Sequence, residues 1–457
     1  MSDVLMMGLR EVADLLRASR IGAQELLGEV VAAIGRHDHI CNAVLAIETE
    51  RAFAEAAALD RLPKEARGPL HGVPLAHKDM YYRAGEVTTC GAGFRRDTRM
   101  GSTAELLQRL DAAGAISFAR LNMAEYAMGP TGHNRSFGRC CNPFAPDRIS
   151  GGSSSGSGAA VAARFAYGAL GSDTGGSVRL PAALCGVVGL KPTQGLLSLE
   201  GVMGLSESLD CPGPMARSSG DIARLMDVMC GTAHHERGLE AGVRGLRIGI
   251  PQSYYVEDLA SEVAASFDAA IGVLRDLGCD IRQVDLPDHG PYADLADAIW
   301  KPEAAALHLR TLQTDPERLA PQARARLMQG LATSAVDYVR AHQLRSLALR
   351  AMLDGPLHAC DIILTPALRI PAPCAVDVEE ANGDAMRRNL EAITAFTRPL
   401  NFLGLPGLVT PCGLDEAGVP MAIQMIGAPR QEALLLRAGH AFESAAGFNR
   451  MRPPFLQ

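Results

Sequence analysis

The sequence predicts an α/β fold: a single large domain in which a mixed, mostly parallel β-sheet is covered by helices on both faces. Short apolar runs bounded by Gly, Pro or Asp recur along the 457 residues, and such runs are typical of strands buried on both faces. Amphipathic helical stretches separate them. No Pro/Ser-rich linker or charged run divides the chain, so we expect one domain over residues 1–457.

Nine of the apolar runs are expected to be strands. In chain order they cover residues 72–77, 115–121, 166–171, 186–190, 246–250, 281–286, 361–364, 407–410 and 422–426.

Helices are predicted where apolar residues recur on one face. Residues 24–34 place Leu26, Val30 and Ile34 on such a face. Residues 261–277 repeat the pattern behind an expected Ser261 cap. A third helical region, rich in Ala and Arg, is expected at about 293–352 and carries the only tryptophan, Trp300.

Composition argues against several classes of protein. Charged residues make up 21% of the chain and the formal net charge is −7, so no basic field is present to attract nucleic acid. The eleven cysteines lack C-x-x-C spacing, which is typical of a reduced, cytoplasmic protein. Neither a signal peptide nor a membrane span is found, and no pattern indicates a metal or another cofactor.

The segment 151–177, GGSSSGSGAAVAARFAYGALGSDTGGS, carries two serine clusters on glycine-rich turns. Before Ser177, two glycines let consecutive N–H groups converge on one small space that can bind an anion. Beside a serine hydroxyl, such a space can hold the oxyanion of a tetrahedral intermediate. The pattern therefore indicates Ser177 as a nucleophile, and the apolar stretch before it argues against a flexible linker.

A serine nucleophile needs a base, either a histidine or a lysine. Only four of the 44 basic residues are lysines. One of them, Lys78, follows the apolar residues 73–76, so we expect it to be buried, and burial lowers the pKa of an amine toward neutrality. This favours Lys78 as the base. A structural salt bridge with Asp79 or another carboxylate is the alternative.

Taken together, these segments resemble the amidase signature family, whose members hydrolyse amides with a nucleophilic serine, a second serine on a cis peptide bond and a lysine. The resemblance is carried by GVPLAHKDM, GGSSSGSGAAVA, GSDTGGSVRLPAALCGVVGLKPTQG, SLDCPGPMARS and GVPMAIQMIGAP. It implies the amidase signature fold with a catalytic core at about residues 70–220, a small-molecule amide substrate and, as is common in the family, a homodimer.

The resemblance also implies roles for individual residues. Ser177 would be the nucleophile, Ser153 the cis-serine that relays protons, and Lys78 the general base. The N–H groups of the oxyanion hole would come from Thr174, Gly175, Gly176 and Ser177, and the polar residues that support the loop would be Ser154, Asp173 and Arg179. Ser155 stands where the family usually has glycine, and it is assigned no role.

Residues that flank the catalytic segments are expected to line the substrate pocket, although each fits the hydrophobic core equally well. They are Met80, Tyr81, Tyr82, Met128, Met203, Leu205 and Trp300. Because methionine is prominent and no charged clamp is evident, we expect a neutral, partly apolar or aryl amide. Esters and carbamates are accessible to the same acyl chemistry.

Other interpretations stay open. The same family contains the glutaminase component of the tRNA-dependent amidotransferase, its A-type chain, which works with partner proteins. Alternatively, Ser154 lies in a G-x-S-x-G pattern at residues 152–156, which fits the nucleophile elbow of an α/β-hydrolase with His358 or His440 downstream. A non-catalytic scaffold protein of the same fold is the remaining alternative.

Overall fold

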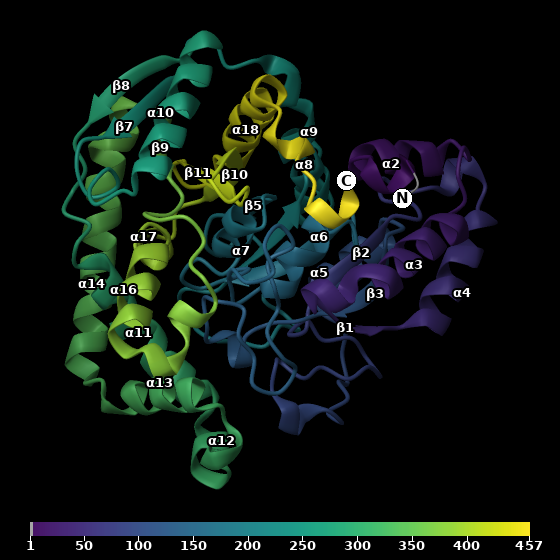
Figure 1. Ribbon diagram of the computed structural model, residues 1–457, viewed down its shortest axis with the longest axis horizontal. Coiled ribbons are helices and arrows are strands. Elements are labelled where there is room, and N and C mark those ends of the chain that lie inside the picture. The colour runs from purple at the N-terminus through teal and green to yellow at the C-terminus, as the bar shows by residue number, and fades with distance from the viewer. Residues whose placement is uncertain (1–2) are drawn as a thin grey trace.

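One sheet of eleven strands runs through the molecule (Figure 1). The computed structural model describes residues 3–457. The strands lie in the order β1-β3-β2-β4-β6-β5-β10-β11-β9-β7-β8. Their bounds are β1 (Val44–Ile47), β2 (Pro74–Lys78), β3 (Ile116–Leu121), β4 (Gly168–Asp173), β5 (Val188–Lys191), β6 (Cys211–Ala216), β7 (Arg247–Pro251), β8 (Asp280–Val284), β9 (Ile362–Pro366), β10 (Gly407–Leu414) and β11 (Pro420–Ile426).

The sheet is mixed, and its parallel strands form two groups. Strands β3, β2 and β4 are parallel neighbours, and so are β9, β7 and β8. The neighbouring pairs between and beside these groups are antiparallel. The expected parallel pairing therefore holds within each group but not across the centre. Short connections such as the one from β10 to β11 permit only antiparallel neighbours, because a parallel pair needs a long crossover.

All nine expected strands overlap observed ones, and β1 and β6 were not predicted. Strand β1 has only four residues, and all of them are half-buried. Strand β6 contains Pro212 and Pro214, and proline argues against a central strand because it has no N–H to donate. The pairing of β6 with β5 covers only Met215 and Ala216, so both prolines lie outside that ladder.

Helices pack along the whole length of the sheet. Every residue of the central strands β2, β3, β4, β5 and β6 is buried. Since successive side chains point to opposite faces, both faces must be covered, as the sequence predicts. The helices are α1 (Asp3–Met6), α2 (Leu9–Arg17), α3 (Ala23–Cys41), α4 (Thr49–Asp60), α5 (Glu105–Ala112), α6 (Ser155–Ala162), α7 (Arg179–Leu184), α8 (Ser219–Cys230), α9 (His234–Arg237), α10 (Ser261–Asp276), α11 (Tyr292–Leu307), α12 (Leu309–Thr314), α13 (Pro321–Ala332), α14 (Ala335–Asp354), α15 (Pro356–Ala359), α16 (Gly383–Thr394), α17 (Arg398–Leu403) and α18 (Glu432–Ala446).

The three predicted helical regions are confirmed. Helix α3 buries Leu26, Val30 and Ile34 as expected. Helix α10 starts at Ser261, but the cap position is Ala260 and no side chain caps the helix, so the expected Ser261 cap is wrong. The Ala- and Arg-rich region forms α11, α12, α13 and α14, which lie together at one side of the molecule (Figure 1).

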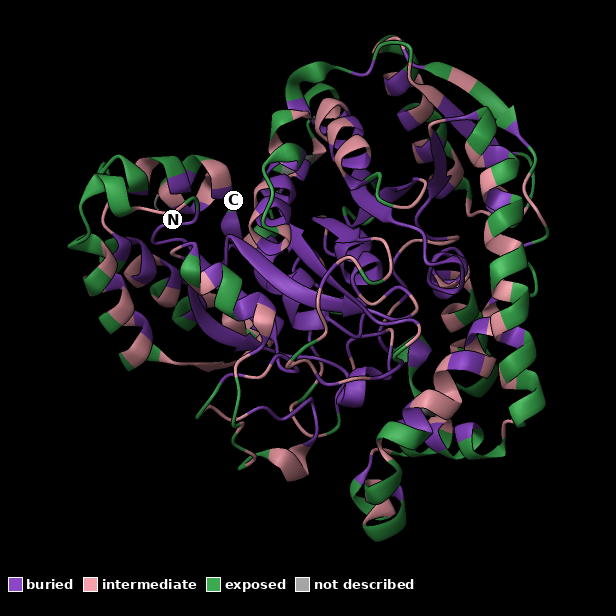
Figure 2. Cartoon of the chain, turned by 180° about the vertical axis from the view of Figure 1, so that it is seen from behind, coloured by how far each residue is buried: buried purple, intermediate pink, exposed green. Residues whose placement is uncertain are grey.

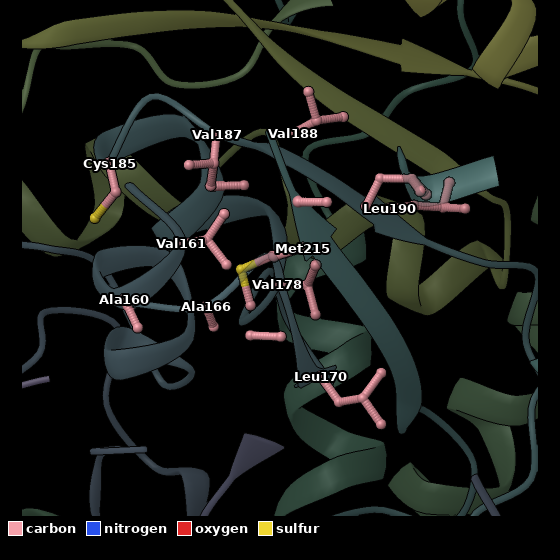
Figure 3. Close-up of a cluster of buried hydrophobic side chains, with 14 of the residues drawn as sticks. Ala160, Val161, Ala166, Leu170, Val178, Cys185, Val187, Val188, Leu190 and Met215 are labelled. Atoms are coloured by element: carbon pink, nitrogen blue, oxygen red, sulfur yellow. The ribbon is translucent and has the colours of Figure 1, made fainter. Parts of the chain in front are cut away.

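The glycine- and serine-rich segment lies in the core. Between residues 151 and 177 only Gly175 and Ser177 are more than slightly exposed. Figure 3 shows Val161, Val178 and Met215 in the hydrophobic cluster around this segment, where α6 and α7 pack against β4, β5 and β6. The strands are buried throughout the centre, whereas exposed residues gather on the outer helices (Figure 2). The segment is therefore a packed element and not a linker.

Within residues 3–457, no helix is long and apolar enough to cross a membrane.

The close approach of β6 to its neighbour gives a stability prediction. A Cβ atom at Gly213 would lie 2.3 Å from the Leu190 carbonyl oxygen, so Gly213→Ala should destabilise the fold by about 1–3 kcal/mol through overpacking. The control is Gly28→Ala in α3, where a Cβ meets nothing within 4 Å and where we expect a gain of about 0.5–1 kcal/mol. Urea unfolding measures both, and equal midpoints for the two variants would contradict the predicted close contact.

Candidate active site

The side chain of Lys78 ends strand β2 inside the protein and meets two serines. Its Nζ lies 2.7 Å from the hydroxyl oxygen of Ser153 and 2.7 Å from that of Ser172. The side chain is fully buried, and it forms no ion pair with any residue that the structure describes. Asp79 instead bonds Arg120 at 3.2 Å and the hydroxyl group of Thr89. The alternative of a Lys78–Asp79 salt bridge is therefore wrong.

Burial changes the protonation of this amine. Desolvation lowers the pKa of Lys78 to about 7, although the carboxylates of Asp210 and Asp173 oppose the shift. An ammonium group without an adjacent counter-charge is unfavourable in a dry interior. Near neutral pH, a large fraction of Lys78 is therefore uncharged and has a lone pair that can accept a proton.

Ser153 reaches Lys78 from the turn that precedes α6. The Gly152–Ser153 peptide bond is cis, which is the geometry that the sequence resemblance implies. A Cβ atom at Gly152 would lie 2.4 Å from the Gly129 carbonyl oxygen, so only glycine fits before the serine. The adjacent Ser154 N–H donates to the Ser177 carbonyl at 3.3 Å. The two serine clusters thus lie side by side.

The loop that carries Ser177 wraps around the carboxylate of Asp173. This carboxylate accepts the N–H groups of Gly176 at 2.8 Å, Val178 at 3.2 Å and Arg179 at 3.3 Å. The Gly176 N–H consequently points into the loop, and the expectation that it serves the oxyanion hole is not met. Among the described residues, the N–H groups of Thr174, Gly175 and Ser177 have no hydrogen-bond partner, so these three remain available.

A buried ion pair holds the loop to the rest of the sheet. Arg179 Nη2 lies 3.0 Å from Asp173 Oδ1, and both side chains are fully buried. Arg179 also donates to Gln424 on β11 at 2.8 Å and to Asn401 on α17 at 2.7 Å. Burial alone would raise the pKa of Asp173, but Arg179 holds it well below its ordinary value. The carboxylate therefore stays ionised and keeps the loop closed.

Ser177 itself is half-buried and faces a cavity of about 310 Å³. Its hydroxyl group makes no hydrogen bond with the residues that the structure describes. The structure thus joins Lys78 to Ser153 directly and brings Ser177 alongside through the backbone of Ser154. Hydrogen bonds between catalytic groups are often long or open before substrate binds.

Three of the seven predicted pocket residues line this cavity: Met128, Leu205 and Trp300. The other four lie outside its lining, because the chain turns inward after Lys78. Tyr81 donates its hydroxyl group to the Gly171 carbonyl at 2.6 Å, and the Met80 sulfur contacts Ser172 Oγ at 3.1 Å. Backbone bonds fix Met203 to Met80 and Tyr82 to the Gly201 carbonyl.

Helix α11 connects the cavity wall to the nucleophile loop. Thr174 Oγ1 donates to Asp210 at 2.5 Å, and Asp210 accepts the N–H of Leu205 at 2.8 Å. The following residues of that segment are held by Glu303 of α11, which accepts the hydroxyl groups of Ser206 and Ser208. The same helix carries Trp300 in the cavity wall.

Several of these residues were not predicted. Ser172 directly precedes Asp173 in the nucleophile segment, and Gln424 and Asp210 lie in two segments that carry the resemblance. Their positions were thus visible in the sequence, but nothing in one sequence indicated their partners. Asn401 stands outside every quoted segment, and only the packing of α17 against the loop brings it to Asp173.

Ser154 does not fit a nucleophile elbow. It is fully buried, and its hydroxyl group lies 3.3 Å from the Ser172 carbonyl, away from the cavity. His358 is exposed and His440 contacts Glu240 at 3.2 Å. Ser155 is also buried and lies 3.3 Å from the Asn122 carbonyl. The α/β-hydrolase interpretation is therefore wrong.

Within the described part of the chain, Asp227, His234 and His235 form one group whose atoms could reach a common metal ion. The Asp227 carboxylate is already occupied, because it accepts the N–H groups of His235 and Glu236 at 3.0 Å each. Its arrangement is that of a carboxylate that caps the start of α9. The group lies on α8 and α9 and shares no residue with the cavity lining.

Comparison with known proteins identifies the family. The family model described as Amidase matches residues 25–436, and the chain belongs to this Amidase family. The A-type chain of the glutamyl-tRNA(Gln) amidotransferase of Thiobacillus denitrificans is 34% identical and aligns over 98% of this chain and 99% of the relative. The corresponding chain of Moorella thermoacetica is 35% identical, with 97% of each chain covered.

Solved structures agree with this assignment. A crystal structure of an amidase is 35% identical, with a TM-score of 0.89 over 96% of this chain and 100% of that chain. The structure of 6-aminohexanoate cyclic dimer hydrolase complexed with substrate is 27% identical, with a TM-score of 0.88 and 100% of both chains covered. Family and neighbours together support an enzyme that hydrolyses carbon–nitrogen bonds of the amide type.

The buried Asp173–Arg179 pair gives a second prediction. Asp173→Asn leaves the guanidinium group buried without its counter-charge, so the fold should lose about 3–5 kcal/mol of unfolding free energy. Asp280→Asn is the matched control, because Asp280 and Arg282 form an ion pair with side chains 47% and 45% exposed, and we expect a change below about 1 kcal/mol. Urea unfolding measures both; similar losses would show that Asp173 is not what holds the loop.

Proposed function

We propose that the protein is a serine amidohydrolase that works through an acyl-enzyme, with Ser177 as nucleophile, Ser153 as proton relay and Lys78 as general base. One observation carries the proposal: a buried amine with a pKa near neutrality lies 2.7 Å from the Ser153 hydroxyl oxygen, beside the Ser177 loop. Buried, perturbed titratable groups at the edge of a cavity are typical of catalytic sites.

In the first half-reaction, Ser177 Oγ attacks the amide carbonyl carbon. Its proton moves to Ser153 Oγ while the Ser153 proton moves to the lone pair of Lys78 Nζ, so each transfer spans one hydrogen bond. The carbonyl oxygen becomes an anion near the free N–H groups of Thr174, Gly175 and Ser177. When the carbon–nitrogen bond breaks, the proton returns by the same route to the leaving amine. Water then hydrolyses the Ser177 ester with the same relay.

Ser172 has a specific part in this scheme. An uncharged amine has two N–H groups but only one lone pair. When Nζ donates to Ser172 Oγ, 2.7 Å away, one of its N–H directions is fixed, and the lone pair can be turned toward Ser153. Ser172 is thus a positioning residue, since it contacts the base and lies outside the cavity lining.

A second candidate function is the glutaminase activity of the A-type chain of an amidotransferase, which is favoured by the similarity to curated relatives with that description. The two functions separate in one assay of the purified chain: the release of ammonia from glutamine, compared with hydrolysis of other small amides. A non-catalytic scaffold is the less favoured alternative, because Lys78, Ser153 and Ser177 are all present. Covalent labelling of Ser177 by a fluorophosphonate probe would exclude it.

Substitution of the three residues tests the mechanism. Ser177→Ala should abolish turnover and probe labelling, and Lys78→Ala and Ser153→Ala should each lower kcat by about 10²–10⁴-fold, since each removes a step of proton transfer. Ser155→Ala is the matched control, because this buried serine lies in the same segment without contact to Lys78, and its variant should keep the parental rate. A Lys78→Ala variant with parental turnover would exclude the relay.

The pKa of Lys78 predicts the pH dependence. Only the uncharged amine accepts a proton, so kcat/KM should rise tenfold per pH unit below about pH 7 and level off above it. Lys78→Ala should lose this limb. Glu443 is the control group, because burial raises its pKa to about 7 as well, yet it bonds Ser219 and Thr410 away from the cavity. If Glu443→Gln removed the limb and Lys78→Ala retained it, the assignment of the base would be wrong.

A further inference from the structure

The cavity in front of Ser177 carries more positive charge than the protein neutralises. Four charged side chains line it: Asp297, Lys301, Arg326 and Arg398. Lys301 Nζ lies 2.7 Å from Asp297 Oδ2, so these two compensate each other. Neither Arg326 nor Arg398 forms a hydrogen bond or an ion pair with any residue in the described range 3–457.

Arg398 stands beside the oxyanion loop. A Cβ atom built on Gly175 would lie 3.8 Å from Arg398 Cγ. The preceding residue fixes this position, because Thr397 Oγ1 donates to the Gly175 carbonyl at 2.8 Å. The guanidinium group therefore starts from a point that is anchored to the same loop as the nucleophile.

Arg326 approaches the cavity from helix α13. Burial and the positive charge of Arg398 lower the pKa of Arg326 to about 10, and the carboxylate of Asp297 partly opposes them. Two guanidinium groups that sense each other's charge inside a partly dry cavity are unfavourable without an anion. The protein supplies none to them, so the stabilising anion has to come from the ligand.

The remaining wall is apolar, with Met128, Leu180, Leu205 and Leu390 among its members. A ligand that suits this cavity has a short apolar body and one anionic end. Arginine forks favour planar carboxylates, which they bind through two parallel N–H···O bonds. An ammonium group on the same ligand would find only Asp297, and that carboxylate is already paired with Lys301.

We propose that the substrate is a small amide that carries a carboxylate and no amino group, and that Arg326 and Arg398 bind this carboxylate while the amide carbonyl lies at Ser177. The proposal rests on the amidohydrolase function given above. It replaces the wholly neutral substrate expected from the sequence, and it retains the partly apolar character. The carboxylate can belong to the acyl part or to the leaving amine, and the kinetic test below has one arm for each.

The acyl arm compares succinamate with its neutral isostere 4-methylpentanamide, and the amine arm compares N-acetyl-β-alanine with N-(3-methylbutyl)acetamide. In at least one arm, kcat/KM should be about tenfold or more higher for the carboxylate. Arg326→Gln and Arg398→Gln should each lower that value about 10–100-fold, as expected for a charge-assisted contact, and should spare the isostere. The matched control is Arg324→Gln, an exposed arginine two residues away on α13.

Binding separates this proposal from the catalytic one. The Ser177→Ala variant cannot turn over substrate, so calorimetric binding of succinate to it does not depend on the mechanism. We expect binding that Arg326→Gln or Arg398→Gln abolishes and Arg324→Gln leaves unchanged. Because each guanidinium is unpaired, its removal should not lower the melting temperature. Preferred hydrolysis of the neutral isosteres, or succinate binding that is absent or insensitive to both substitutions, would overturn the proposal. A wild-type enzyme that binds succinate but neither labels at Ser177 nor hydrolyses any amide would overturn only the catalytic mechanism.

Discussion

The arrangement of the site depends on the buried ion pair between Asp173 and Arg179. Its carboxylate gathers N–H groups from the turn that carries Ser177, and its guanidinium reaches Gln424 on β11 and Asn401 on α17. One residue pair thereby joins the end of β4, the start of α7 and two elements more than 200 residues away in sequence. A glycine-rich turn has little stiffness of its own, and here an ionised, fully buried group provides that stiffness.

The site also separates two uses of positive charge. Lys78 lies in the dry interior without a carboxylate in contact, and its pKa falls until the amine can accept a proton. Arg326 and Arg398 lie at the cavity, where a guanidinium keeps its charge at any physiological pH. Lysine suits the first task because it can lose its proton, and arginine suits the second because it cannot. The scarcity of lysine in the chain made the first group conspicuous.

Much of this was accessible from the sequence. Apolar runs located nine strands because burial on both faces leaves a continuous pattern, and glycine beside serine located the two catalytic turns. Strand β6 was missed since Pro212 and Pro214 contradict the usual rule for a central strand. Ser172 lay inside a recognised segment, but its contact with Lys78 depends on the register of β2 and β4. The cavity arginines were hidden among the many other arginines of the chain, and only the packing of α13 near the start of α17 distinguishes them.

Helix α11 shows how the recognition of a ligand is tied to the chemistry performed on it. The helix presents Trp300 to the cavity, and one turn later Glu303 secures the segment whose Asp210 contacts Thr174 in the nucleophile loop. A displacement of this helix would therefore shift the ligand and the reacting serine together. In divergence or redesign, new ligand preferences are easier to reach by replacing side chains on a fixed α11 than by moving the helix itself. The backbone of this segment is thus under tighter constraint than its surface composition suggests.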